Sequence, residues 1–152
     1  MTAILDMNPT LLDARTPTKQ TALILAAQRN LYWMTVLLAD RGADVNLIDN
    51  ANKTALMYRY IDISFLTVYA THGLNPDLIW PGTGGMSILV QYCAFTASVS
   101  GYGAYAIIIL NHTNPKLNIL DSNGYTPLYS AVKSGHIEVV RGFIRKGVDL
   151  NC

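Results

Sequence analysis

The chain has 152 residues, a length that predicts a single domain and leaves no room for two ordinary catalytic domains. Hydrophobic residues make up 51% of the chain and charged residues 14%, so it has the material for a folded core and not the composition of a disordered segment. Eleven Lys and Arg against ten Asp and Glu give a formal charge of +1, which argues against nucleic acid and against an anionic membrane as partners.

Sequence signals for metal binding, export or membrane insertion are weak throughout. Cys93 and Cys152 lie far apart and have no Cys or His neighbour at ligand spacing, so we expect neither a metal site nor a disulfide framework. The N-terminal segment MTAILDMNPT lacks the basic and apolar parts of an export signal, which favours a cytoplasmic location. The uncharged stretch 78–115 is interrupted by Pro, Gly, Ser and Thr, so it does not predict a membrane span.

Short segments that begin with a hydroxyl residue recur along the chain. They start at Thr21, Thr54, Ser87 and Thr126, at offsets of 33, 33 and 39 residues, and each reaches a Leu two residues later. Ser or Thr at such a position caps the free N–H groups at the start of a helix, and Pro127 is tolerated in a first helical turn. Turn-forming residues precede the last three of these starts. Each repeat therefore predicts a turn followed by an inner and an outer helix.

The repeats differ in regularity along the chain. The first has the small residues Ala26 and Ala27 in its predicted inner helix, which let neighbouring helix pairs approach closely. The second closes early, at Gly73, and the third has six extra residues, which we place between Thr96 and Gly103. The predicted repeats span approximately residues 16–48, 49–81, 82–120 and 121–152, and residues 1–15 are a candidate partial or capping repeat.

The last repeat, DSNGYTPLYSAVKSGHIEVVRGFIRKGVDLN, resembles an ankyrin repeat almost throughout. The first repeat is similar, and the resemblance covers about residues 16–152. It implies an all-α fold: an ankyrin-repeat solenoid of about four helix-turn-helix repeats, the middle two irregular, with short β-turn fingers, in one domain over 1–152. The residues that carry the resemblance in the last repeat are Gly124, Thr126, Pro127, Leu128, Ala131, Gly135, His136, Val140, Gly147 and Asn151.

Bulky residues replace the small ones in the two central repeats. Arg59-Tyr60 and Tyr92-Cys93 stand where the first repeat has Ala26-Ala27. We expect a wider seam there, with the tyrosines filling the space, Cys93 buried, and Arg59 reaching solvent or a carboxylate such as that of Asp62.

The three histidines favour structural roles over catalysis. His136 follows Gly135 at a predicted helix start, His72 ends a predicted outer helix, and His112 falls in a predicted surface turn. The glycines of 82–85 lack the Lys-Ser/Thr of a phosphate-binding loop, so we expect a flexible turn. We expect no catalytic residues, no cofactor and no metal ligands.

Membership of the ankyrin family implies a protein-binding module that contacts a protein partner through the concave groove and the finger tips, without enzymatic activity. Tyrosine, phenylalanine and methionine anchors beside polar and basic residues are typical of a binding patch. The corresponding partner-binding positions are Gln20, Gln28, Arg29, Asn50, Lys53, Asp62, Met86, Phe95, Tyr125, Lys133 and Ser134.

Other functions are also compatible with the sequence. The chain has a structural role if the uncharged stretch 78–115 forms a self-association surface or docks on a further domain, or if the repeats belong to a longer array. A more remote reading is a small-ligand pocket or enzyme built around Arg59, Tyr60, Tyr92 and Cys93. Apolar residues of 137–144 recur at helical spacing, which predicts weak self-association through the last repeat.

Overall fold

The computed structural model describes residues 11–59, 62–94 and 102–150. Within these ranges the regular secondary structure is helical, apart from an isolated antiparallel bridge between Ile79 and Ser87. The all-α fold expected from the repeats is therefore confirmed. The chain divides into two compact parts, an N-terminal unit of residues 1–74 and a C-terminal unit of residues 75–152.

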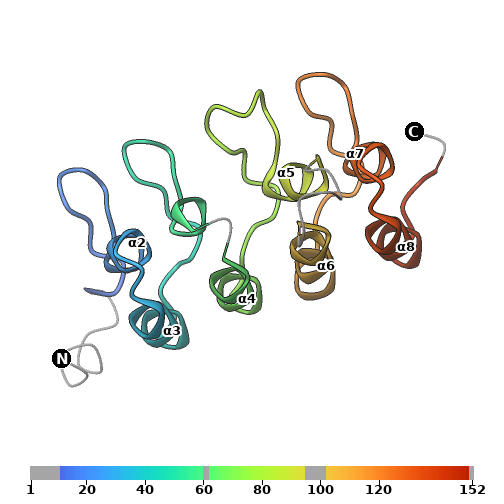
Figure 1. Cartoon of the computed structure of the whole chain (residues 1–152). Coiled ribbons are helices and arrows are strands. Elements are labelled where there is room, and N and C mark those ends of the chain that lie inside the picture. Colours follow the sequence, from blue (N-terminus) through green and yellow to red (C-terminus); the bar gives the residue numbers. More distant parts are fainter. Residues whose placement is uncertain (1–10, 60–61, 95–101, 151–152) are drawn as a thin grey trace. The chain divides into compact units, whose positions relative to one another are not determined.

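The described residues of the N-terminal unit form one complete helix pair and one shortened pair. Helices α2 (Ala22–Gln28) and α3 (Tyr32–Asp40) form the first pair, and a single 3₁₀ turn (Leu56–Tyr58) with α4 (Ile63–Thr71) forms the second. The two inner elements pack on each other, as do the outer helices α3 and α4. In Figure 1 the loops that precede the two inner elements project to the same side.

The C-terminal unit contains two complete helix pairs. They are α5 (Ile88–Ala94) with α6 (Tyr102–His112), and α7 (Pro127–Lys133) with α8 (Ile137–Arg145). Inner helix α5 packs on α7, and outer helix α6 packs on α8 (Figure 1). This is the nearest-neighbour packing by which a short helix pair buries a face that it cannot bury alone.

Hydroxyl caps begin three of the inner helices, as the sequence predicts. The side chains of Thr21 and Thr126 accept hydrogen bonds from the N–H groups of Ile24 and Tyr129, at 3.2 and 3.1 Å. Ser87 does the same for Val90 at 3.3 Å. These bonds satisfy N–H groups that a helix start leaves without an intrahelical partner.

Outer helices α3, α4 and α8 (Ile137–Arg145) end in a common reversal. Gly42, Gly73 and Gly147 have φ angles of 89°, 83° and 75°, a left-handed conformation that residues with a Cβ rarely adopt. In each case the residue after the glycine returns a hydrogen bond to a carbonyl of the last turn, for example from Val148 to Phe143 at 3.2 Å. The chain is thereby turned back toward the next finger.

The second repeat departs most from the pattern, because its inner helix is reduced to three residues. Thr54 caps nothing there: its hydroxyl oxygen is buried and has no hydrogen-bond partner among the described residues. Nε of Arg59 donates to the carbonyl of Ala27 at 2.9 Å, near the end of α2, an acceptor that the sequence did not predict. Arg59 is also partly exposed, in keeping with the expectation that it reaches solvent.

The third repeat has the aromatic filling that its sequence predicts. Tyr92 is fully buried and stacks on Tyr105, with ring centroids 5.2 Å apart. Cys93 is fully buried as well. Tyr60, the other predicted filler, lies outside the described residues, as does the segment 96–101 of the predicted insertion. The end of that segment was placed wrongly in the turn, because Tyr102 and Gly103 belong to α6.

Candidate functional site

Three finger tips are built alike, from residues 16–20, 49–53 and 121–125. In each, the N–H of the first residue donates to the carbonyl of the fifth at 3.0 to 3.1 Å. The side-chain oxygen of the first residue, Thr16, Asp49 or Asp121, accepts the N–H of the fifth. The fourth residue is left-handed, which Gly124 adopts without strain and which Asn52 tolerates. The tips therefore hold their outward side chains on an internally bonded frame.

The finger before α5 is longer and is closed differently. The N–H of Trp80 donates to the carbonyl of Met86 at 2.9 Å, and the Thr83 hydroxyl donates to the carbonyl of Trp80 at 2.7 Å. Between these residues the chain passes through left-handed glycines at 82, 84 and 85. The expectation of a glycine turn, in place of a phosphate-binding loop, fits this geometry.

Neighbouring fingers within each unit are joined by one backbone hydrogen bond. In the N-terminal unit the N–H of Asn50 donates to the carbonyl of Thr18 at 3.1 Å. In the C-terminal unit the N–H of Ser122 donates to the carbonyl of Gly84 at 3.2 Å. A side chain at Gly84 would meet the Ser122 hydroxyl at 3.0 Å, so this contact depends on a residue without Cβ.

A cluster of Asp49, Tyr58 and Lys53 stands at the second finger. The Tyr58 hydroxyl donates to Oδ2 of Asp49 at 2.6 Å, and Nζ of Lys53 lies 5.2 Å from the centre of the Tyr58 ring. Burial by itself raises the pKa of the Asp49 carboxyl, but the hydrogen bonds from Tyr58, Lys53 and Ala51 and the charge of Lys53 outweigh it and bring the pKa below its ordinary value. Asp49 is therefore an ionised internal anchor of the finger.

A second cluster, of Tyr125, Tyr129 and Lys133, stands at the last finger and on α7. The two rings stack with centroids 4.3 Å apart, and Nζ of Lys133 lies 5.3 Å from the centre of the Tyr125 ring. All three side chains are exposed. Stacked tyrosines beside a cation offer a large, rigid contact surface with little side-chain entropy to lose on binding.

A cavity of about 250 Å³ adjoins this second cluster within the C-terminal unit. One side is formed by Met86 and Ala94, and the other by the last finger and α7. The Ser134 hydroxyl donates to the carbonyl of Ala94 at 3.0 Å and so joins the two sides. The residues that line the cavity are Met86, Ala94, Asp121, Asn123, Tyr125, Ser130, Lys133 and Ser134.

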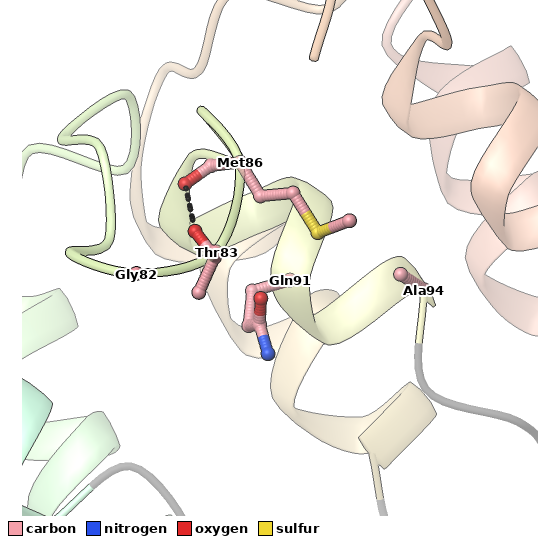
Figure 2. A pocket seen from close by; sticks show the side chains of 5 residues that line it. All are labelled: Gly82, Thr83, Met86, Gln91 and Ala94. Atoms are coloured by element: carbon pink, nitrogen blue, oxygen red, sulfur yellow. Dashed lines mark hydrogen bonds between the residues drawn. The ribbon is translucent and has the colours of Figure 1, made fainter. Parts of the chain in front are cut away.

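A second hollow, of about 350 Å³, lies on α5 beside its finger and shares Met86 and Ala94 with the first. Figure 2 shows the side chains of Met86 and Gln91 extending along it, with the Thr83 hydroxyl directed at the Met86 carbonyl. Oε1 of Gln91 is buried and has no hydrogen-bond partner among the described residues. Met86 thus forms part of the wall of both hollows.

The predicted binding residues fall into two groups. In the N-terminal unit, the finger tips contain Gln20, Asn50 and Lys53. Gln28 is the last residue of α2, and Arg29 follows it. Asp62 caps α4, because its side chain accepts the N–H of Ser64. The structure brings together Met86, Tyr125, Lys133 and Ser134 around the cavity of the C-terminal unit. Phe95 lies outside the described residues.

Sequence reasoning missed several residues of this surface. Tyr58 and Tyr129 were not singled out, although each is the partner of a predicted residue. Asp49 and Asp121 were noted only as turn formers. A usable signal was present, because an Asp begins both fingers and a Tyr with a Lys follows within twelve residues in each case.

The described histidines lie at or next to helix ends, and Cys93 lies in the core. His136 precedes α8, and His72 ends α4, where its ring contacts the carbonyl of Val68 at 2.7 Å and the Asp40 carboxylate at 3.0 Å. His112 is the last residue of α6, so our assignment of it to a turn was wrong by that margin. Burial raises the pKa of the Cys93 thiol, which keeps it protonated.

Neither a metal-binding cluster nor a membrane-spanning helix occurs among the described residues. They contain no group of three or more His, Cys, Asp or Glu side chains placed to hold a metal ion. None of their helices combines the length and the apolar character needed to cross a bilayer.

Repeated turns, paired antiparallel helices and stacked inner elements define a helical-repeat protein. Family models agree with that class and specify it further. The model described as "Ankyrin repeats (3 copies)" matches residues 81–152, and that described as "Ankyrin repeat" matches residues 18–50. The chain belongs to the ankyrin repeat family, as its last and first repeats predicted. Ankyrin repeats are generally protein-protein interaction modules and are typically not catalytic.

Proposed function

We propose that this chain is a non-catalytic module that binds a protein partner through its finger tips and the adjoining side of its inner helices. The observation that carries the proposal is the exposed Tyr125, Tyr129 and Lys133 cluster beside the cavity bounded by Met86 and Ala94. Exposed, stacked aromatic rings next to a partly apolar hollow have the composition of an interface hot spot. The internally bonded finger tips support it, because they place these side chains without ordering on binding.

A matched set of alanine variants tests this function. Proteins retained by the immobilised chain from native cell extract are identified by mass spectrometry, and the affinity of each purified candidate is then measured. We expect Tyr125→Ala and Lys133→Ala to weaken binding by about 1 to 3 kcal/mol without changing the unfolding midpoint. Arg145→Ala, which removes an exposed charge from outer helix α8, serves as the control.

The remaining predicted anchors are tested in the same way. Lys53→Ala and Phe95→Ala extend the series to the second finger and to the end of α5. A partner whose affinity is unchanged in all four variants would contradict the proposed site. A loss of equal size in Arg145→Ala would show that overall charge, and not this surface, governs binding.

A second candidate is self-association, favoured by one specific observation on α7 and α8. Val132 is 60% exposed, whereas Cys93, at the same position of the preceding repeat, is fully buried under α7. Ile144 and Leu150 are also exposed. Sedimentation velocity across rising protein concentration tests it: association that Val132→Ser and Ile144→Ser abolish supports this function, and a monomer at all concentrations contradicts it.

We further propose a cytoplasmic location for the chain. The free thiol of Cys93 supports a reducing compartment, because it is buried among apolar residues and unpaired. Imaging of the tagged chain beside compartment markers is the measurement. Recovery of the chain mainly in an exported or membrane fraction would contradict this assignment.

A further inference from the structure

On the binding surface just proposed, the two signs of charge are used differently. The carboxylates of Asp49 and Asp121 are buried, and each accepts N–H groups of its own finger. Lys133 is exposed, and Lys53 is half-buried at a finger tip. Among the described residues, neither ammonium group lies within ion-pair distance of a carboxylate. The charge offered to a partner here is therefore positive.

The same arrangement occurs once in each compact unit. Both fingers begin with a buried Asp, and both place a lysine ammonium over a tyrosine ring, at 5.2 Å for Lys53 and 5.3 Å for Lys133. Contact with the ring restricts the lysine side chain without using its N–H donors. Each ammonium is thus pre-positioned to receive an acceptor from outside.

Two exposed carboxylates on outer helices are already paired. Asp40 on α3 and Glu138 on α8 are both more than half exposed, and they lie within ion-pair distance of His72 and Arg141. The ammonium group of Lys133 has no such partner among the described residues, although it stands beside a cavity. This favours a negatively charged group of the partner at Lys133.

The cavity beside Lys133 adds an apolar requirement. Met86, Ala94 and the ring of Tyr125 supply its apolar walls, and the Asp121 carboxylate in its lining is already bonded within the finger. A volume of about 250 Å³ is of the size that one large side chain occupies. A polyanion that binds by backbone charge would leave such a cavity empty, and it would need a run of cations that this surface does not have.

We propose, building on the binding function above, that the partner presents an acidic segment in which an Asp or Glu lies next to a large apolar residue. The carboxylate binds Lys133, and the apolar side chain enters the cavity formed by Met86, Ala94 and Tyr125. Recognition thus combines a charge-assisted hydrogen bond with the burial of one anchor residue.

Selection from a random library of 12-residue peptides displayed on phage tests the proposal on the full chain. We expect enriched peptides to contain Asp or Glu beside Leu, Ile, Met, Phe or Trp. A synthetic enriched peptide and its Asn/Gln counterpart are then titrated against the wild-type chain and two single-charge variants, Lys133→Met and Arg145→Met. We expect at least fivefold weaker binding for the amide peptide and for Lys133→Met, and unchanged binding for Arg145→Met.

The outcomes separate this inference from the function on which it rests. Enriched peptides without acidic residues that still require Tyr125 would overturn the acidic specificity and leave protein binding at this surface intact. Absence of any peptide that requires Tyr125 would contradict both. A single-stranded oligonucleotide that binds as tightly as the peptide, and equally to both methionine variants, would overturn the inference in favour of a polyanion. Thermal unfolding of each variant checks that the fold is retained.

Discussion

The two helix pairs of the N-terminal unit occupy equivalent places in the repeat pattern and solve the packing problem differently. The first has a seven-residue inner helix, capped by Thr21 and lined with alanine. The second has only a three-residue 3₁₀ turn, and the hydroxyl of Thr54 caps no helix N–H there. Its Arg59 donates a hydrogen bond to the Ala27 carbonyl of the first pair. A repeat can thus lose most of its inner helix and still pack on its neighbour, provided that its outer helix and side-chain contacts compensate.

The outer helix of the second pair supplies the largest of these contacts. Phe65 is buried, its ring lies 5.5 Å from that of Tyr32 on α3, and Tyr69 is fully buried beside it. Phe65→Ala removes this filling and leaves a cavity, so we expect it to destabilise the chain by about 3 to 5 kcal/mol. Urea denaturation followed by circular dichroism measures the change. Phe65→Leu is the milder control. An alanine variant as stable as the leucine variant would show that the packing of Phe65 against α3 does not stabilise the second repeat.

Arg59 gives the next largest effect. Arg59→Ala removes the hydrogen bond to the Ala27 carbonyl, and we expect a loss of about 1 to 2 kcal/mol, because a charged donor is lost but Asn30 still donates to the same oxygen. Hydrogen exchange locates the effect: amide protection should fall at the end of α2 as well as around residue 59. Arg15→Ala, at an exposed position, should change neither. Loss of protection confined to the second repeat would contradict a link between the pairs.

The hydroxyl caps distinguish the regular repeats from the second one at a smaller scale. We expect Thr21→Val and Thr126→Val each to destabilise the chain by about 1 kcal/mol, because each leaves a helix N–H without its acceptor. Thr54→Val should be neutral or slightly stabilising, since it replaces a buried oxygen that has no partner in the described structure with a methyl group. Melting curves of each variant beside the wild-type chain measure these changes. An equal loss of stability in all three variants would show that the Thr54 hydroxyl contributes as much as the two caps.

Acid sensitivity of the second finger is the smallest effect predicted. The pKa of Asp49 is lowered in the folded chain, so its ionised form stabilises the fold above the pKa of the unfolded state, near 4, and this contribution disappears as the pH falls below that value. We expect Asp49→Asn to lower the unfolding free energy at pH 7 by about 1 kcal/mol or less, and we expect this difference to shrink as the pH is lowered toward 3. Glu138→Gln, on an exposed ion pair, is the control. A difference that persists unchanged at pH 3 would rule out the ionised carboxylate as its cause.

Much of the fold followed from local sequence, because caps and turns act within a few residues. The starts at Thr21, Ser87 and Thr126 were predicted correctly, since each depends on a hydroxyl and an N–H three residues away. The bond of Arg59 was not, because its acceptor lies 32 residues earlier in the chain. The same limit applies to the site. Single positions such as Tyr125 and Lys133 were identified, but the cavity that they share with Met86 arises only when α5 and α7 pack together.

The contact between Arg59 and Ala27 also bears on how interchangeable the repeats are. In an array of uniform repeats, any one can be removed, duplicated or exchanged, because every junction is the same. Here the second repeat reaches back to a carbonyl near the end of the inner helix of the first, so its stability depends on having a helix pair before it. Placed at the start of an array, it would bring a guanidinium without its acceptor and an inner turn too short to replace that contact. The second repeat is thus suited to an internal position and not to an N-terminal one.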